Sequence, residues 1–430
     1  MRANHRKRVY HLKMPVTVSA RATLDTIRAK HRDGARIYVP GVAAEPLVLA
    51  EALRAGPELA ADHTFLGIWI PGVNTTDWAG LHPKARSEQI FLGAQWRESF
   101  RTGRAGFLPL IYTRAWRWLA ETPVDAAFVT VAPPDSNGRA SLGSASDFTP
   151  ALWDRAGLKF AIVNPHMPAI PSAPSIDLAA CDGVIEALTP LPGYDAGTLA
   201  PEFAAIAGHV AGLVRDGDAV QFGLGKVQLA VLPALAGHKG LTIHSGMVSD
   251  PLLEILDGYR VAAIHTGTIL GGSELNARLA ADRRVTMKTV RQTHFPEAFQ
   301  TLNGFCAINS LIEVDLFGQG NGEFVSGEQV SGGGGLLDFA RGAQISSGGR
   351  AIFALVSTAR GGSVSRIVPR LGSGAVTLTR SDIGIVVTEH GIAHLDGLDI
   401  DARAEALIAI AAPQHRDTLA NDWAQMRRAM

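Results

Sequence analysis

A glycine turn is the first segment of the chain whose residues are suited to ligand chemistry. Gly223-Leu224-Gly225 lies between a strand-like run and a helical pattern. Glycines at such a turn let backbone N–H groups face a ligand oxygen or phosphate at the start of the helix. A dinucleotide fingerprint would place a further glycine at position 228, where the chain has Gln228, so an NAD site gains little support. A tight turn without a ligand explains the same glycines, and both interpretations stay open.

A second segment combines four glycines with an acidic residue. Gly332, Gly333, Gly334 and Gly335 are followed by two leucines and then Asp338. Ordering four glycines costs much conformational entropy, which a flexible surface loop would avoid. A phosphate or pantetheine chain lying against bare backbone would explain the run if it is ordered. By itself, the run favours neither interpretation.

One arginine and the histidines complete the set of chemically capable residues. Arg366, in the segment SRIVP, is suited to pairing with a phosphate or carboxylate, although an ordinary structural ion pair would also explain it. The 14 histidines show no HxH or HExxH spacing, so we expect no metal site. The chain has no GxSxG elbow, which argues against an α/β serine hydrolase.

Strands and helices must bring these residues together. Short apolar runs bounded by Gly, Pro or Asn are typical of buried strands in a parallel sheet, and amphipathic segments follow several of them. The alternation predicts α/β architecture with mainly parallel sheets. A new cycle begins after Leu191-Pro192-Gly193, so we expect two domains, 1–195 and 196–430. The expected strands are 37–39, 65–70, 126–131, 160–163, 219–222, 241–244, 351–355 and 383–387, and the expected helices include 47–55 and 201–214.

Composition narrows the class of protein. The 40 basic and 40 acidic side chains cancel, so the positive excess typical of nucleic-acid binding is missing. No apolar run reaches the ~18 residues of a membrane helix, and we expect a soluble protein. Cys181 and Cys306 form neither a CxxC motif nor a disulfide framework. This cysteine usage fits a reducing cytoplasm, and we expect no nucleic-acid or membrane partner.

Taken in order, the motifs resemble the acetyl-CoA hydrolase/transferase family, and most closely its 4-hydroxybutyrate coenzyme A transferase branch. The resemblance covers most of the chain. In the first half it rests on the segments VAPPD at 131–135, NG at 137–138, SLG at 141–143 and VNPHMP at 163–168. In the second half it rests on the GLG turn, IHS at 243–245, AINS at 307–310, VDLFGQ at 314–319, GGGGLLDFARGA, SRIVP and VVTEHG at 386–391.

The resemblance implies two similar open α/β domains of the coenzyme A transferase type, with the active site between them. It implies a glutamate that attacks the acyl-CoA carbonyl, becomes a glutamyl-CoA thioester and passes CoA to an acceptor carboxylate. It further implies a CoA thioester as substrate, no tightly bound cofactor, and a homo-oligomer. Backbone N–H groups would stabilise the oxyanion around Gly223, Leu224, Gly225 and Gly246. The CoA would contact Gly332, Gly333, Gly334, Gly335, Asp338 and Arg366.

One position departs from the family pattern at the centre of its chemistry. The family's IHS segment normally continues with Glu-Met, and that glutamate is the nucleophile. This chain has Gly246-Met247 instead. Glycine has no side chain, so the covalent route cannot run from position 246. The usual glutamine after the paired glycines is also replaced within the run at 332–335.

Three explanations compete for this departure. In the first, another carboxylate takes over; Glu45, in the loop at 41–46, is preferred, and Glu389 of the TEHG segment is the second candidate. A role beside a helix N-terminus would explain Glu45 equally well. In the second, water or a direct ternary mechanism makes the protein an acyl-CoA hydrolase or a different lyase. In the third, the protein binds acyl-CoA without turnover. We expect the first: CoA transfer between short-chain carboxylic acids, with Glu45 as the catalytic residue.

Overall fold

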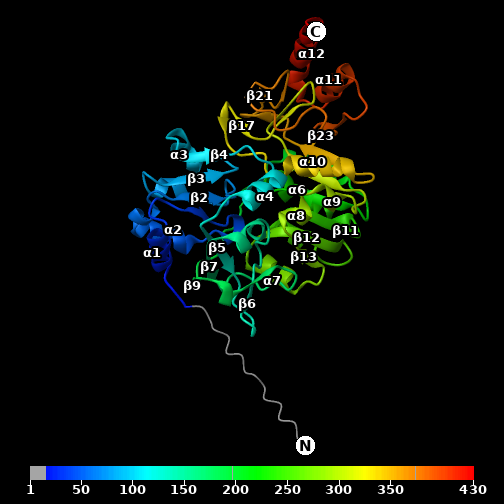
Figure 1. Cartoon of the computed structure of the whole chain (residues 1–430). Coiled ribbons are helices and arrows are strands. Elements are labelled where there is room, and N and C mark those ends of the chain that lie inside the picture. The colour runs from blue at the N-terminus through cyan, green and yellow to red at the C-terminus, as the bar shows by residue number, and fades with distance from the viewer. Residues whose placement is uncertain (1–15, 196, 373) are drawn as a thin grey trace, which may run out of the picture.

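Two open β-sheets form the framework of the molecule (Figure 1). The computed structural model describes residues 16–195, 197–372 and 374–430, so residues 1–15 of the first expected domain and residues 196 and 373 of the second lie outside the described residues. In the first sheet the parallel strands follow the order β4-β3-β2-β1-β5-β7-β9. These strands are β1 (Arg36–Tyr38), β2 (Thr64–Gly67), β3 (Arg86–Gln89), β4 (Ala105–Phe107), β5 (Ala126–Val131), β7 (Leu158–Val163) and β9 (Gly183–Glu186).

The second sheet is built in the same way and is larger. Its strands follow the order β13-β12-β11-β10-β14-β19-β23-β24, and β24 pairs antiparallel with β23 at one edge. The strands are β10 (Ala219–Phe222), β11 (Leu241–Ser249), β12 (Val261–Leu270), β13 (Val285–Met287), β14 (Cys306–Ser310), β19 (Arg350–Ala354), β23 (Ile385–Thr388) and β24 (Gly391–His394).

Both sheets follow one path through space. Numbered along the chain within each sheet, the parallel strands run 4-3-2-1-5-6-7. In this order the connections change direction between the first strand and the fifth, and such a switch point is where ligands approach open α/β sheets. The expected architecture, two similar and mainly parallel α/β domains, is therefore confirmed.

The elements named from the sequence are all present, with shifted ends. The largest shift is in β11, which continues past the expected end at residue 244 to Ser249. The expected domain boundary at 195/196 falls between β9 and α5, and it stays a prediction.

The helices of the first domain are α1 (Ala20–Lys30), α2 (Leu47–Ala55), α3 (Arg97–Arg101) and α4 (Tyr112–Glu121). Those of the second are α5 (Glu202–Ala211), α6 (Lys226–Ala234), α7 (Ser273–Ala281), α8 (Val290–Thr293), α9 (Pro296–Phe299), α10 (Leu336–Ile345), α11 (Ile400–Ala409) and α12 (Pro413–Arg428).

Apolar side chains bury both faces of the second sheet. Along β19, Ile352 and Ala354 belong to one core cluster, while Phe353 belongs to the cluster on the opposite face. Successive residues of a strand point to opposite faces, so a nearly continuous apolar run is what a doubly covered strand requires. The first sheet has a core of its own, which includes Trp69, Trp78 and Phe128.

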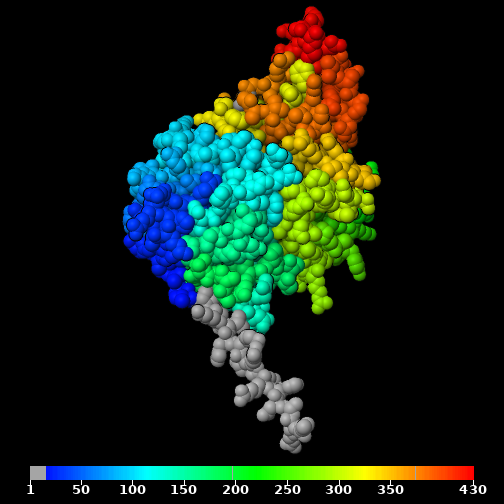
Figure 2. All heavy atoms as spheres, viewed as in Figure 1, coloured from blue at the N-terminus to red at the C-terminus, as the bar shows by residue number. Residues whose placement is uncertain are grey.

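The two domains meet over a broad surface, and a smaller region lies on top of them. Figure 2 shows side chains of the first domain, blue to blue-green, abutting those of the second, lime to orange. The upper region carries short strands between α9 and β23, and α12 projects from it (Figure 1). None of the helices in the described part of the chain has the length and apolar character needed to span a membrane. The short strands of this region are β15 (Glu313–Asp315), β16 (Gly320–Asn321), β17 (Phe324–Val325), β18 (Glu328–Gln329), β20 (Thr358–Ala359), β21 (Val364–Ser365) and β22 (Ile367–Val368). In the first domain, β6 (Arg139–Ser141) and β8 (Ser175–Asp177) form a separate antiparallel pair.

Candidate active site between the two domains

The first domain docks onto an exposed edge of β12. Strand β13 pairs with β12 only at residues 264–266, although β12 continues to Leu270. A segment of the first domain takes the edge that is left: the Ser146 N–H donates to the Gly267 carbonyl at 2.9 Å, and the Ile269 N–H donates to the Ser144 carbonyl at 2.9 Å. Unpaired strand edges expose N–H and C=O groups that another segment can satisfy. This pairing delivers the next residue, Asp147, to the second sheet.

Glycines on neighbouring strands form a floor of bare backbone beside this junction. Strands β11 and β12 pair Ser245 with Thr266 and Met247 with Thr268, which places Gly246 next to Gly267. On the other side, Gly223 directly follows β10. The three glycines Gly223, Gly246 and Gly267 are called the glycine floor below. The Ser245 hydroxyl donates to the Phe222 carbonyl at 2.7 Å and ties β11 to the end of β10.

The GLG turn stands at the switch point of the second sheet. Gly225 has φ of +123°, a conformation that side-chain-bearing residues rarely adopt. Helix α6 starts at the next residue, Lys226. The N–H groups in the first turn of a helix lack partners within that helix. The turn therefore has the geometry needed to present donors to an oxyanion, and the role of Gly223, Leu224, Gly225 and Gly246 in that task stays a prediction.

A histidine ring fills the space above Gly246. A Cβ atom on Gly246 would lie 2.9 Å from Cε1 of His294, and a Cβ atom on Gly335 would lie 2.5 Å from its Nε2. The ring also packs against Phe339 and Tyr112, at centroid distances of 4.3 and 4.9 Å. Position 246 is therefore closed to a larger side chain as long as the ring of His294 stays in place.

His294 is held as a neutral imidazole. Its Nδ1 lies 2.7 Å from the Thr293 hydroxyl, and its Nε2 is buried without a hydrogen-bond partner. Burial holds the pKa of His294 well below its usual value. Neighbouring His244 is buried in the core, and burial lowers its pKa to about 4. Both rings therefore contribute shape without charge near pH 7. His294 was missed from the sequence because only the fold brings it to Gly246.

Glu45, the carboxylate favoured by the sequence, lies in the loop after β1. The short helix η1 (Val42–Ala44) in this loop belongs to an apolar cluster with Leu270 of the second domain. Glu45 itself is only 5% exposed, and the Asn74 side chain donates to its Oε2 at 3.1 Å. Burial raises the pKa of Glu45, and the bond from Asn74 offsets part of that rise. The loop thus reaches the interface, while the carboxylate is paired within its own domain.

Asp147 is a second carboxylate at the interface, and no motif in the sequence indicated it. Its Cβ would lie 3.3 Å from a Cβ atom built on Gly267. The residue is half-buried. Burial raises the pKa of Asp147 to about 6, although hydrogen bonds, one of them to the Thr268 side chain, offset part of the rise. Burial and then the Asp147 charge raise the pKa values of Tyr38 and Tyr112.

The run at 332–335 is ordered and pressed against protein. A Cβ atom on Gly332 would lie 2.1 Å from the Ile90 carbonyl oxygen, and Gly334 has φ of +53°. The Tyr112 N–H donates to the Gly334 carbonyl at 3.0 Å. Contacts with the first domain and with His294 thus account for glycine at 332, 334 and 335, whereas a Cβ on Gly333 would meet only Ile111, at 3.7 Å. CoA binding by these glycines stays a prediction.

Asp338 and Arg366 lie in different parts of the second domain. Asp338 joins the two domains, because it accepts from the Thr113 N–H at 3.1 Å and from the Thr113 hydroxyl at 2.7 Å. Burial raises the pKa of Asp338 to about 6. The side-chain Nε of Arg366 is buried without a hydrogen-bond partner. The backbone N–H of Arg366 donates to the Ser357 carbonyl at 2.8 Å. Ser357 also binds Glu389 through its N–H at 2.8 Å and its hydroxyl at 2.6 Å.

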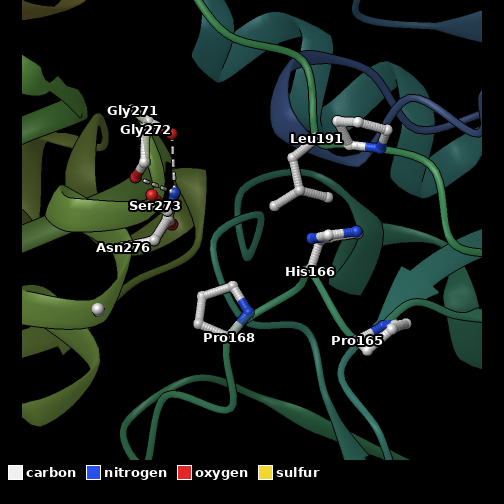
Figure 3. Close-up of a pocket in the computed structure, with 10 residues that line it drawn as sticks. Pro165, His166, Pro168, Leu191, Gly271, Gly272, Ser273 and Asn276 are labelled. Carbon is white, nitrogen blue, oxygen red and sulfur yellow. Dashed lines mark hydrogen bonds between the residues drawn. The ribbon is translucent and has the colours of Figure 1, made fainter.

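A pocket of about 480 Å³ opens where β12 ends (Figure 3). Asn276 on one wall donates to the carbonyls of Gly271 and Gly272, at 2.8 and 3.0 Å. The Ser144 hydroxyl donates to Oδ1 of Asn276 at 2.6 Å, which links this wall to the segment that carries Asp147. The volume falls in the range of small-molecule sites. Further lining residues are Pro165, His166, Pro168, Pro190, Leu191, Ser273 and Ala277.

The described residues contain no group of three or more His, Cys, Asp or Glu side chains that could hold a metal ion.

Comparison with known proteins gives two family matches. Residues 22–186 match the acetyl-CoA hydrolase/transferase N-terminal domain, and residues 271–423 match the acetyl-CoA hydrolase/transferase C-terminal domain. Residues 144–147 of the junction lie within the first matched region. Strand β12 (Val261–Leu270) ends immediately before the second matched region begins at residue 271.

Similar proteins extend the match over nearly the whole chain. The 4-hydroxybutyrate coenzyme A transferase of Clostridium kluyveri is 33% identical over 413 residues, 93% of this chain and 96% of that protein. The succinyl-CoA:cyclohexane-1-carboxylate CoA transferase of Geobacter metallireducens is 34% identical over 343 residues, 77% of this chain and 78% of that protein. Among solved structures, RipA from Yersinia pestis superposes with a TM-score of 0.85 at 28% identity, covering 95% of this chain and 100% of that one.

Proposed function

We propose that this chain, which belongs to the acetyl-CoA hydrolase/transferase family, is an acyl-CoA:carboxylate CoA-transferase that acts on short-chain carboxylic acids. The observation that carries the proposal is the glycine floor at the domain interface. Bare backbone on adjacent strands lets a thioester approach closely, and the GLG turn beside it offers N–H groups to the oxyanion that forms when a thioester carbonyl is attacked.

The class of substrate is inferred from the relatives. Their names give 4-hydroxybutyrate, succinyl and cyclohexane-1-carboxylate groups as the acids that exchange CoA. We place the acyl-CoA over the glycine floor and assign CoA contacts to Gly332, Gly333, Gly334, Gly335, Asp338 and Arg366. The open side of Gly333 and the unpartnered Nε of Arg366 support this assignment.

The catalytic carboxylate comes from the first domain in this proposal. Glu45 is the residue that the sequence favours, and its loop packs against Leu270 beside the floor. Asp147 stands closer to the floor itself, at Gly267. Either carboxylate would form a covalent acyl intermediate in a two-step exchange, as carboxylate nucleophiles do.

Thioester hydrolysis is the second candidate function, and Gly246 is the observation that favours it. With no side chain at this position, water has one competitor fewer for the acyl carbonyl. In that case a carboxylate with a raised pKa would serve as a general base, whose efficiency is greatest when its pKa lies near the working pH.

The proposal extends to the compartment, the oligomeric state and the cofactor requirement of the enzyme. We propose a cytoplasmic homo-oligomer with no tightly bound cofactor. Cys181 and Cys306 are free, buried thiols, as a reducing compartment allows.

An exchange assay tests the proposed function. The protein is incubated with butyryl-CoA and one acid at a time, chosen from acetate, succinate, 4-hydroxybutyrate and cyclohexane-1-carboxylate, and the CoA species are separated by chromatography. We expect a new acyl-CoA whose formation depends on the added acid. Free CoA formed at the same rate without any acid would replace transfer by hydrolysis. Bound CoA with no product would leave only a binding protein.

A further inference from the structure

We propose that Asp147 is the nucleophile that carries the acyl group and then CoA through the exchange. The inference rests on the proposed transferase function and names the residue that performs it. In a two-step exchange, an enzyme group holds CoA while the first acid leaves and the second arrives. The glycine floor itself supplies only backbone, so this group has to reach over the floor from elsewhere.

Backbone pairing fixes Asp147 at the floor. The Ser146 N–H is bound to the Gly267 carbonyl at 2.9 Å, and the Asp147 carbonyl accepts from the Val290 N–H at 3.0 Å. Asp147 is thus fastened on both sides to the second domain, with its Cβ in the space that a side chain on Gly267 would enter. Paired strands lie about 4.8 Å apart, and β12 lies between the segment of Asp147 and β11, so two such spacings separate the backbone of Asp147 from that of Gly246.

The direct route from Gly246 is closed, whereas Asp147 is only half-buried. The His294 ring occupies the space that a side chain on Gly246 would need. Gly246 and Gly267 are paired residues on adjacent strands, so their side-chain directions lie on one face of the sheet. Asp147 thus lies on the face on which a nucleophile from position 246 would have stood, and it remains half-exposed there.

The other carboxylates considered are engaged in structural bonds. Glu45 is buried and accepts from Asn74 at 3.1 Å. Asp338 accepts twice from Thr113, and Glu389 accepts twice from Ser357. Asp147 is bonded through the Thr268 side chain and combines access to solvent with contact to the floor. Its raised pKa, about 6, leaves it ionised at pH 7 and more basic than an ordinary aspartate.

The exchange balances without any further reactant. An Oδ atom of the Asp147 carboxylate attacks the acyl carbonyl; a C–O bond forms, the C–S bond breaks, and CoA leaves as a thiolate. The thiolate then attacks the aspartyl carbonyl of the mixed anhydride, which releases the donor acid with one oxygen from Asp147 and leaves an aspartyl-CoA thioester. The acceptor carboxylate reverses both steps, and one of its oxygens stays on Asp147.

Isotope transfer tests the assignment on the unmodified enzyme. The full chain is incubated with butyryl-CoA and acetate labelled with a heavy oxygen isotope at both carboxyl oxygens, and the peptide containing Asp147 is analysed by mass spectrometry. We expect the heavy isotope in the Asp147 side chain. With butyryl-CoA and hydroxylamine alone, we expect a hydroxamate at the same residue. Label on Glu45 or on any other carboxylate, or acid-dependent transfer without label on Asp147, overturns the assignment.

Matched variants separate this assignment from the function. Asp147→Asn should lower exchange by roughly 10³-fold or more, as loss of a covalent nucleophile does, while CoA binding persists. Asp154→Asn, an exposed aspartate of the same domain, should leave exchange unchanged, and Glu45→Gln should leave the label on Asp147. Full exchange by Asp147→Asn overturns the assignment and keeps the transferase function. Acid-independent release of CoA with label on Asp147 keeps the assignment and overturns the transferase function.

Discussion

The two sheets share one strand order but differ in how far their strands extend. In the first sheet β2 and β3 have 4 residues each, whereas the corresponding strands of the second sheet, β11 and β12, have 9 and 10. The additional residues carry Gly246 and Gly267 and expose the edge on which residues 144–146 dock. The two sheets thus share a topology but differ in strand length. The longer strands, β11 and β12, carry the surface on which we propose that the reaction takes place.

The loops that follow the first strand of each sheet also differ, in the side-chain volume that they bring to the interface. After β1, the short helix η1 fills the interface with Val42, Ala43 and Ala44. After β10, the corresponding loop is the GLG turn, which adds hardly any side-chain volume. One domain supplies packing and carboxylates, and the other supplies bare backbone. In the proposed site, therefore, neither domain alone supplies both the bare backbone and the carboxylate.

A branched side chain at Gly267 should disturb the long strand most strongly. A Cβ there meets the Gly246 carbonyl at 3.1 Å and Asp147 Cβ at 3.3 Å, so Gly267→Val displaces Asp147. We expect a loss of transfer of about 10²-fold, because misplacing a catalytic group by about 1 Å has an effect of that size. The measurement is kcat/KM for CoA exchange. Gly106→Val on β4 of the first sheet meets only ordinary contacts of 3.4 Å or more and should retain activity. Equal losses in both variants would contradict the asymmetry.

Introducing glutamate at position 246 should destabilise the protein and should not increase the rate of transfer. Gly246→Glu places its Cβ 2.9 Å from the His294 ring, and overpacking of this kind costs about 2 kcal/mol. Denaturant unfolding measures the loss of stability. The double variant Gly246→Glu with His294→Ala removes the clash and should recover part of the loss. A fully stable Gly246→Glu protein would show that the ring of His294 yields freely.

Transfer should fall at acidic pH. Burial raises the pKa of Asp147 to about 6, so its reactive ionised form is dominant above that pH and is lost as the pH falls through 6. From pH 7 to pH 5 we expect about a tenfold decrease in kcat/KM. The neighbouring Tyr38, Tyr112 and His294 stay neutral over this range, because burial raises the pKa values of the phenols and lowers that of the imidazole.

Asp338 is the control for this pH profile, since burial also raises its pKa to about 6. Asp338→Asn should keep the midpoint of the profile while changing the absolute rate. If the pH dependence disappears in this variant, the group that titrates is Asp338 and not Asp147.

The smallest expected effect concerns the hydrogen bond from the Thr113 hydroxyl to Asp338, which crosses the interface between the two domains. Thr113→Val removes the hydroxyl that donates to Asp338 at 2.7 Å and keeps the backbone donor. The loss of one hydrogen bond to a charged group should lower stability by about 1 kcal/mol or slightly more. Thermal unfolding with and without CoA measures this change. Thr26→Val is the matched control and should be nearly neutral, because the exposed Thr26 hydroxyl donates to the Ala22 carbonyl of its own helix at 2.8 Å.

The sequence predicted the fold better than the site, for physical reasons. Buried parallel strands are apolar on both faces, so runs such as 126–131 and 219–222 are visible without any tertiary information. The end of β11 was predicted five residues too early, because Ser245 and Gly246 interrupt the apolar run and pairing with β12 extends the strand past them. Strand pairing is a tertiary property that no local pattern reports.

The site residues illustrate the same limit. Gly246 and the GLG turn were found through motifs, and the loop of Glu45 does reach the interface. Asp147 and His294 were missed because each becomes a neighbour of the floor only when residues 144–147 and α8 dock on the second sheet. The run at 332–335 illustrates the opposite case: its glycines were read as room for a ligand, and protein atoms already use much of that room.

The contact between Gly246 and the ring of His294 constrains how this protein can change over evolutionary time. A side chain at 246 and an imidazole at 294 exclude each other, so the two positions are epistatic although they lie on different elements. A lineage that gains a glutamate at 246 must first replace the imidazole with something smaller, or pass through an unstable intermediate. The order of substitutions is thereby restricted: because the family pattern has glutamate at position 246, ancestral reconstructions of this lineage should show position 246 reduced to glycine before an imidazole enters at position 294.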